Sequence, residues 1–259
     1  MHSDMPHESS QDREVVTFLT ARWRRGETTL LIKAKSKEAI LAAIEAAKQA
    51  RFEIEGYVLR YPEFRYSLHP LKIRDPEKPK VVSLMLRAAE IAGVGPFAAV
   101  AGAIAQVASV AASEVGGAIV ENGGDISASG KFDFSVGIFA GDSPLSGTIG
   151  FRITSGDLPI GICTSSGTVG HSISFGVADA VVVVADEASV ADAAATAIAN
   201  EVTGEDIEQS IKNGLEKADE IDEIRGCLII RGKMAGMKGK LPKLIPTERK
   251  SVLKEIDWV

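Results

Sequence analysis

The chain has 259 residues, of which 45% are apolar and 25% are charged, and its formal net charge is -6 at pH 7. These values are typical of a globular protein with a substantial core, and they exclude fibrous and wholly disordered classes. The negative charge argues against a general nucleic-acid binder, and the two distant cysteines, Cys163 and Cys227, favour neither a zinc site nor a disulfide framework. We therefore expect a cytoplasmic protein that binds small molecules or proteins.

Residues 1–11 are polar and lack the basic and apolar regions of a secretory signal, so they are predicted to form a disordered tail before one domain over 12–259. Two β-rich runs, 14–21 and 28–35, predict a hairpin at a sheet edge. Ser36 offers an N-cap to a helix whose apolar residues recur at helical spacing toward Tyr57. A second helix is predicted over 81–92.

Residues 91–112 carry no charge over a length that would span a bilayer. The stretch is rich in Ala and Gly, is broken at Gly95-Pro96 and contains Gln106, so its predicted insertion energy is weak. We therefore favour a buried helix, packed tightly between sheets or against a ligand, over a membrane span. Pro96 suits the first turn of that helix.

From Ala118 onward, short apolar runs separated by Gly, Asn, Asp and Ser predict a sheet. The run 180–185 is wholly apolar and β-branched in its centre, which predicts a central strand covered on both faces. Helices are predicted over 189–200 and 205–222, and a further strand over 227–230.

The basic stretch RGKMAGMKGKLPKLIPTERK, residues 231–250, allows a nucleic-acid or membrane role. It lacks aromatic residues for base stacking until Trp258. We interpret it as a solvated, partly irregular terminus.

The first of three polar clusters is Asn122-Gly123-Gly124-Asp125, directly after a predicted strand. Paired glycines let a ligand approach the backbone, and Asp125 could bind a ribose hydroxyl, a base edge or a metal. An ordinary Asx-Gly turn leading into the next strand explains the same residues. The motif is not the GxGxxG of a Rossmann fold.

The second cluster, residues 163–172, places hydroxyls and backbone donors between two glycines. Such a loop can hold a phosphate, although serine-rich turns are also common on surfaces. His171 is a candidate general acid or base. Cys163 with His171 would form a nucleophilic pair only with a third orienting group, which the sequence does not identify.

The third cluster contains Asp192 and Thr196, which the i, i+4 spacing places on one helix face among alanines. Two hard oxygens suit Mg²⁺ if a nucleotide supplies phosphate oxygens. Alternatively, Ser189 and Asp192 form a capping box at the helix start.

Together these clusters resemble a known family. VENGGDI, the TSSG of CTSSG and VVVVADEASVADAAATAIAN are similar to the GGD, TSG and ADA-x-x-T signatures of ApbE-like proteins, whose best-known members are Mg²⁺-dependent FAD:protein FMN transferases. The segments YPEFRYSLHP and GVGPFAAVAGAIAQ extend the resemblance over nearly the whole chain, to an uncharacterised cytoplasmic branch of that superfamily. The resemblance implies an α+β, T-fold-like architecture with mixed sheets and packed helices in a single compact domain.

The resemblance also implies roles for individual residues. Asp192 and Thr196 would be the Mg²⁺ ligands. The pocket for FAD or FMN would be lined by Asn122, Gly123, Gly124, Asp125, Thr164, Ser165, Ser166 and Gly167.

Two family elements are altered in this chain. The KGxxxD element falls on residues 101–106, where Ala101 and Gln106 replace the lysine and the aspartate. The HHIIDP stretch is missing, and its nearest remnant is GHSISFG, in which His171 is the stand-in for the transferase's catalytic histidine.

We therefore expect a Mg²⁺-dependent flavin-nucleotide-binding protein that cleaves or transfers across a pyrophosphate. Its partners would be the nucleotide and an acceptor or partner protein, with neither nucleic acid nor membrane. The missing lysine and aspartate favour an alternative, a non-catalytic accessory protein that kept the pocket. The branch that the chain resembles suggests anaerobic sulfur assimilation for that alternative.

Overall fold

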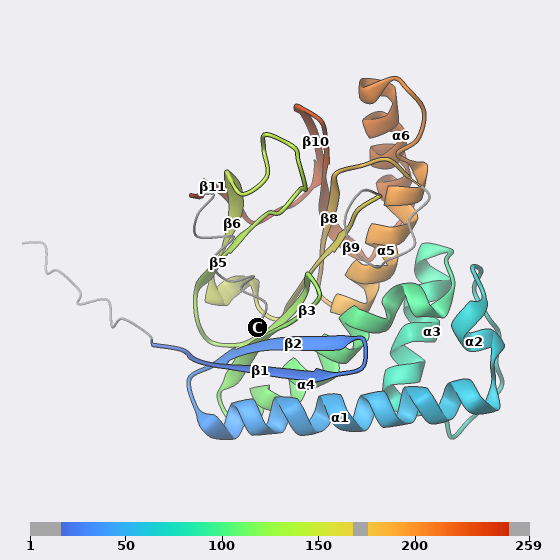
Figure 1. The fold of residues 1–259 in the computed structure, drawn as a ribbon, viewed down its shortest axis with the longest axis vertical. Helices are drawn as coiled ribbons and strands as arrows, with labels where there is room; N and C mark the ends of the chain where they lie inside the picture. The colour runs from blue at the N-terminus through green and yellow to red at the C-terminus, as the bar shows by residue number, and fades with distance from the viewer. Residues whose placement is uncertain (1–16, 168–175, 249–259) are drawn as a thin grey trace, which may run out of the picture.

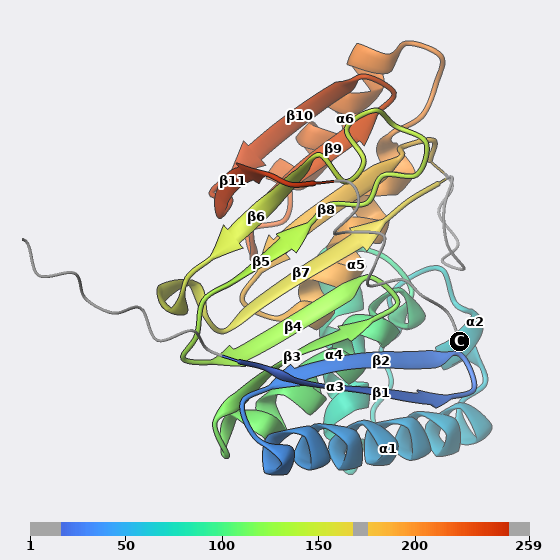
Figure 2. The same ribbon diagram turned by 60° about the vertical axis from the view of Figure 1, so that its left-hand side comes forward.

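The computed structural model describes residues 17–167 and 176–248. An eight-stranded sheet lies between a layer of helices and a second, three-stranded sheet (Figures 1 and 2). The larger sheet has the order β1-β2-β3-β4-β7-β8-β9-β10 and is antiparallel throughout. The described residues thus form one mixed α+β domain, as predicted, while the tail predicted over 1–11 lies outside them.

The N-terminal part begins with the expected hairpin of β1 (Leu19–Arg25) and β2 (Thr28–Ala34), and β1 is an edge strand. Helix α1 (Lys37–Arg60) starts as predicted, because Ser36 Oγ accepts a hydrogen bond of 3.1 Å from the Ala39 amide. The short α2 (Glu63–Tyr66) follows.

Helix α3 (Lys80–Ala92) ends at Gly93, whose φ of 75° is the left-handed conformation that glycine adopts freely. A 3₁₀ turn, η1 (Pro96–Ala99), then leads into α4 (Val100–Ser113). The segment Pro96–Ser113 has the length and composition of a membrane span, and half of it is buried inside the structure. Helix α4 packs between α1 and α5 and against β3 and β4, so the expectation of a buried helix is confirmed.

The strands predicted from Ala118 onward divide between two sheets, whereas the sequence pattern predicted one. Strands β3 (Gly117–Asn122), β4 (Asp125–Gly130), β7 (Ile160–Ser165), β8 (Ala180–Ala185) and β9 (Ile224–Arg231) belong to the larger sheet. Strands β5 (Phe134–Gly137) and β6 (Ile149–Ile153) belong to the smaller one, and the turn η2 (Ser155–Asp157) follows β6.

Strand β8 is central and covered on both faces, as its apolar run predicted. Val181 and Val183 lie in the core beneath the helices, whereas Val182 and Val184 lie in the core between the two sheets. Helices α5 (Ala188–Glu201) and α6 (Ile207–Asp219) follow β8, close to the predicted bounds.

The interpretation of residues 231–250 as a partly irregular terminus is wrong for the residues that the structure describes. Met234–Gly239 forms β10 and Lys243–Pro246 forms β11, which pair with β9 and β6 respectively. Gly236 explains the close packing of β10 on α6, since a Cβ there would lie 2.5 Å from Ile211. Most residues of β10 and β11 are exposed, as expected, but backbone pairing with β9 and β6 makes the two segments regular strands.

Candidate functional site

The first polar cluster is a tight turn at one end of the larger sheet. Gly123 and Gly124 join β3 to β4 with φ values of 65° and 107°, so the conformation itself requires glycine. In the part of the chain that the structure describes, no atom lies within 4 Å of the positions that Cβ atoms would take on either glycine, so the described residues leave open space beside the turn. The interpretation as a turn leading into a strand is therefore correct, and it is compatible with a ligand lying against the backbone.

Asp125 begins β4 immediately after this turn and is only 7% exposed. Its Oδ1 accepts a hydrogen bond of 3.2 Å from the Thr164 amide on β7. Burial raises the pKa of Asp125 to about 7, although the hydrogen bonds from Thr164 and from the Cys163 side chain lower it. The first two clusters thus meet at one carboxylate.

Asp192, on α5, lies near Asp125. Its Oδ2 accepts a hydrogen bond of 2.8 Å from the amide of Gly102, in the first turn of α4. Burial raises the pKa of Asp192 well above its ordinary value, and the charge of Asp125 raises it further, against hydrogen bonds from the amides of Gly102 and Ala101. Asp192 of α5 therefore accepts a hydrogen bond from a backbone amide at the start of α4, which has no partner within α4.

The alternative of a capping box at Ser189 is wrong. Helix α5 begins at Ala188, its N-cap is Glu187, and the Glu187 side chain makes no capping hydrogen bond. The Ser189 hydroxyl and amide both donate to Gln106 Oε1, at 2.9 and 3.0 Å. Asp192, which that box needed, is bonded to Gly102 instead.

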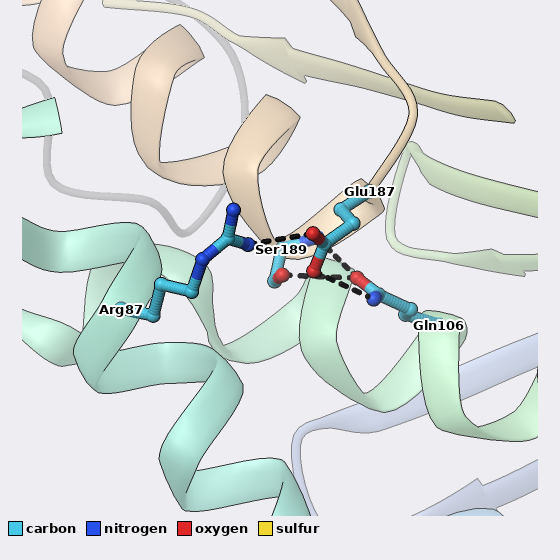
Figure 3. A network of polar contacts seen from close by, with 4 residues as sticks. All are labelled: Arg87, Gln106, Glu187 and Ser189. Atoms are coloured by element: carbon cyan, nitrogen blue, oxygen red, sulfur yellow. Dashed lines mark hydrogen bonds and ion pairs between the residues drawn. The ribbon is translucent and has the colours of Figure 1, made fainter. Parts of the chain in front are cut away.

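Gln106 joins three helices in a polar network (Figure 3). Its Nε2 donates to Glu187 Oε2 at 3.2 Å, while Oε1 accepts from Ser189. Arg87 of α3 pairs with the same glutamate at 2.6 Å. Gln106 therefore holds α4 against the start of α5.

Two glycines let the elements come close enough for these contacts. A Cβ on Gly102 would lie 2.3 Å from the Ala188 carbonyl oxygen and 2.7 Å from the Asp192 Cβ. A Cβ on Gly161 of β7 would lie 2.4 Å from the Ala188 Cα. Because α5 meets both α4 and β7 at Ala188, a larger residue at either glycine would push Asp192 away from Gly102.

Asn122 and the hydroxyl residues of the second cluster lie near Asp125. Asn122 Nδ2 donates to the Ala101 carbonyl at 3.1 Å, which fixes the turn to the start of α4. Thr164 and Ser165 belong to the end of β7 rather than to a loop, and Ser166 and Gly167 follow them. Ser165 is 4% exposed, and its Oγ has no hydrogen-bond partner among residues 17–167 and 176–248. A buried hydroxyl without a partner leaves a donor and an acceptor for a ligand.

Cys163 is fully buried beside Asp125. Its Sγ donates to the Ala188 carbonyl at 3.3 Å, and burial together with the charges of Asp125 and Asp192 raises its pKa well above the ordinary value. A thiol in this setting stays protonated, which opposes a role as a nucleophile. His171, its suggested partner and the candidate acid or base, lies outside the described residues.

Asp192 and Thr196, the expected Mg²⁺ ligands, carry oxygen donors of the kind that Mg²⁺ prefers, and Asp125 is near enough to Asp192 for its charge to act there. Thr196 is half-buried one helical turn beyond Asp192. Neither carboxylate forms an ion pair with a lysine or arginine between residues 17 and 248, leaving aside 168–175. The described chain gathers no group of three or more His, Cys, Asp or Glu side chains able to hold a metal. Few protein ligands suit Mg²⁺, which keeps waters and takes phosphate oxygens.

The sequence does not reveal one part of the candidate site, the backbone amides of Ala101 and Gly102 beside Asp192. The family element that these residues resemble is defined by a lysine and an aspartate side chain, so its pattern says nothing of backbone amides. The break at Gly95-Pro96 before an uncharged helix was the available signal, because it marks a helix start whose amides need partners.

Comparison with known proteins gives a family and a fold. A family model described as AbpE bacteria matches residues 11–224. A UPF0280 protein of Methanocaldococcus jannaschii is 44% identical over 234 residues, which cover 89% of this chain and 94% of that protein. A UPF0280 protein of Methanopyrus kandleri is 45% identical over 222 residues, covering 85% and 90%.

Among solved structures, the Flavin Transferase ApbE from Vibrio cholerae aligns with a TM-score of 0.51 and 12% identity over 92% of this chain and 99% of that chain. A histidine-to-glycine mutant of the same transferase gives a TM-score of 0.53 and 14% identity over the same shares. At such low identity the likeness shows a shared fold.

Proposed function

The chain belongs to the AbpE bacteria family, and from this premise we propose that it binds a flavin nucleotide, FAD or FMN, with Mg²⁺ and cleaves or transfers across a pyrophosphate. One observation carries the proposal: the charge of the buried Asp125 on β4 acts on the half-buried Asp192 of α5, and neither carboxylate has a basic partner in the described chain. Two neighbouring carboxylates that are largely removed from water are costly without a cation, so a bound cation would stabilise them.

Each residue of the site has a part in this proposal. Asp125, Asp192 and Thr196 would hold Mg²⁺, which when bound neutralises phosphate oxygens and the charge that develops on a leaving phosphate. The open Gly123-Gly124 turn would receive the nucleotide against its backbone. Gly102 fixes the Asp192 carboxylate through its amide, so the ligand is oriented before the nucleotide arrives.

The unpartnered hydroxyl of Ser165 supports a polar ligand at the end of β7. Thr164, Ser166 and Gly167 would line the same side of the pocket, and His171 remains the candidate catalytic acid or base. An acceptor or partner protein in the cytoplasm belongs to the same proposal, and the motif resemblance supports it.

Retained ligand tests the proposal directly. Protein purified without added nucleotide is denatured, and the supernatant is analysed by mass spectrometry for FAD and FMN. If the protein loses its ligand on purification, titration calorimetry with FAD, FMN and ATP, each with and without Mg²⁺, measures binding directly. Mg²⁺-dependent binding of a flavin nucleotide is expected. An empty protein that gives no heat with any of them contradicts the proposal.

The alternative function is a non-catalytic accessory protein with the same pocket. The specific observation in its favour is Gln106, whose amide is occupied by Ser189 and Glu187 where the family pattern has a carboxylate. Incubation with FAD and Mg²⁺, followed by chromatography, separates the two functions. Release of FMN and AMP, or flavin attached to an acceptor, supports the enzyme, and persistent binding without turnover supports the accessory protein.

A further inference from the structure

Helix α2 and the residues after it lie against the turn that leads into α4. In both views α2 lies beside the C-terminal end of α1 (Figures 1 and 2). Phe64 of α2 is fully buried, and its ring meets those of Tyr57 and Phe97 edge to face, with centroids 5.0 and 5.9 Å apart. Phe97 belongs to η1, the 3₁₀ turn directly before α4. Aromatic pairs of this geometry favour one arrangement of α2 and η1.

A second contact between α2 and η1 leaves no room for a side chain. Gly95, the residue before η1, approaches the backbone of Ser67 so closely that a Cβ on it would lie 1.8 Å from the Ser67 carbonyl oxygen. The φ of Gly95 is -73°, so this close approach, and not the conformation, requires glycine. The peptide of Ser67 is itself held, because its amide donates to the Glu63 carbonyl at 2.9 Å and its Oγ donates to the His69 carbonyl at 2.7 Å.

The same turn sets the place of the amides that hold Asp192. The Gly95 carbonyl accepts a hydrogen bond of 3.1 Å from the Ala98 amide, and η1 continues into α4 without a break. Ala101 and Gly102, in the first turn of α4, donate their amides to Asp192, and the bond from Gly102 is 2.8 Å long. Because helical backbone joins Gly95 to Gly102, a displacement of η1 carries over to the Asp192 contact.

We propose that Gly95 and Phe64 are positioning residues of the candidate site. Together they fix η1, and η1 sets where the Gly102 amide meets Asp192. This inference rests on the proposed function, in which Asp192 is a ligand of Mg²⁺. A methyl group on Gly95 would have to move η1 and Ser67 apart by about 1 Å or more before ordinary contact distances return. Ligand sites need their groups held to within roughly 0.5 Å, so such a displacement weakens binding although neither residue contacts the nucleotide.

Amide hydrogen exchange, followed by NMR, tests the positioning without any nucleotide. Gly95→Ala should speed exchange at the Gly102 amide by at least about tenfold relative to the Ile32 amide. Ile32 is fully buried in β2, between β1 and β3, and reports global opening. Gly226→Ala is the matched control, since a Cβ there would also meet a backbone carbonyl oxygen, that of Lys238 at 2.4 Å, but on β9, two strands away from β7. It should speed both amides equally. The same ratio in the two variants means that Gly95 serves the fold alone, and it overturns the proposal.

Phe64→Leu tests the same link through the aromatic contact, and it keeps a buried apolar side chain if Gly95→Ala does not fold. Phe132→Leu is its matched control, because Phe132 is also buried and packs against two other rings, in the core between the two sheets. Both variants lose a ring, whereas only Phe64→Leu should raise the Kd for FAD or FMN with Mg²⁺, by about tenfold. Equal Kd values for the two folded variants overturn the proposal. A wild type that binds no flavin nucleotide contradicts the proposed function, and the exchange ratio at Gly102 then decides the positioning.

Discussion

The carboxylate of Asp192 caps the start of a helix to which it does not belong, because its Oδ2 accepts a hydrogen bond of 2.8 Å from the amide of Gly102 in α4. This contact explains how a residue on α5 can be held rigidly beside Asp125. It also changes what a substitution at Asp192 should do to stability.

Asp192→Asn should leave the unliganded protein as stable as wild type, or more stable. The amide oxygen still accepts from Gly102, and a buried acid with a raised pKa is removed. Asp192→Ala should lose about 1 to 3 kcal/mol because the Gly102 amide is left without a partner. Urea unfolding of the three proteins measures the difference. An Asn variant that is as unstable as the Ala variant would show that the acid itself stabilises the fold.

The stability of wild type without ligand should fall as the pH rises toward neutral. The pKa of Asp125 is about 7 in the folded state against an ordinary value of 3.8, so between these values the folded chain keeps a proton that the unfolded chain has lost. The free energy of unfolding then decreases with pH, by at most about 1.4 kcal/mol per pH unit for one proton. Asp192, whose pKa is also raised, acts in the same direction, so Asp125→Asn should make this dependence less steep without removing it, and saturating Mg²⁺ with nucleotide should also weaken it. Identical slopes for wild type and variant would remove Asp125 as the cause.

Thr196→Ala should weaken Mg²⁺-dependent nucleotide binding while changing the stability of the unliganded protein by no more than about 0.5 kcal/mol. Thermal melts with and without Mg²⁺ and nucleotide provide the measurement. Wild type should gain about 2.7 kcal/mol at a ligand concentration one hundred times the Kd. Thr196→Ser keeps the hydroxyl and is the control. Equal stabilisation of wild type and of the Ala variant would exclude Thr196 as a ligand.

Gln106 should act through structure and not through the ligand. Gln106→Ala removes the acceptor for Ser189 and should cost about 1 to 3 kcal/mol, with little change in the nucleotide affinity of the folded protein. Gln106→Glu should also destabilise, because its carboxylate would face that of Glu187, and Glu187→Gln in the same chain should restore part of the loss. A double-mutant cycle measures this coupling. A change of affinity without a change of stability would instead place Gln106 in the pocket.

Cys163 and Cys227 should resist thiol reagents at neutral pH in the native protein. Both are buried; burial raises the pKa of Cys163 well above the ordinary value and that of Cys227 to about 12. Mass spectrometry after alkylation should find both modified only when denaturant is present. Rapid native labelling of Cys163 would revive the nucleophilic pair with His171.

The sequence alone determined most of the helices, the strand β8 and the family. Ser36 followed by apolar residues at helical spacing is enough to start α1, because a helix and its cap depend on near neighbours in the chain. The polar motifs around Asp125, Ser165 and Asp192 likewise pointed to one family before any contact between them was known. Their roles as ligands remain predictions.

Only the tertiary structure decided which partners these residues have. Helical periodicity places Asp192 and Thr196 on one face, but it does not say that this face meets Gly102 and Asp125. Residues 234–239 contain two glycines, and residues 243–246 are few and end in proline, so neither segment indicates a strand by itself. They become strands because β9 and β6 offer hydrogen bonds to their backbones. Such long-range pairing depends on the assembled sheet, and the local pattern of a segment carries little information about it.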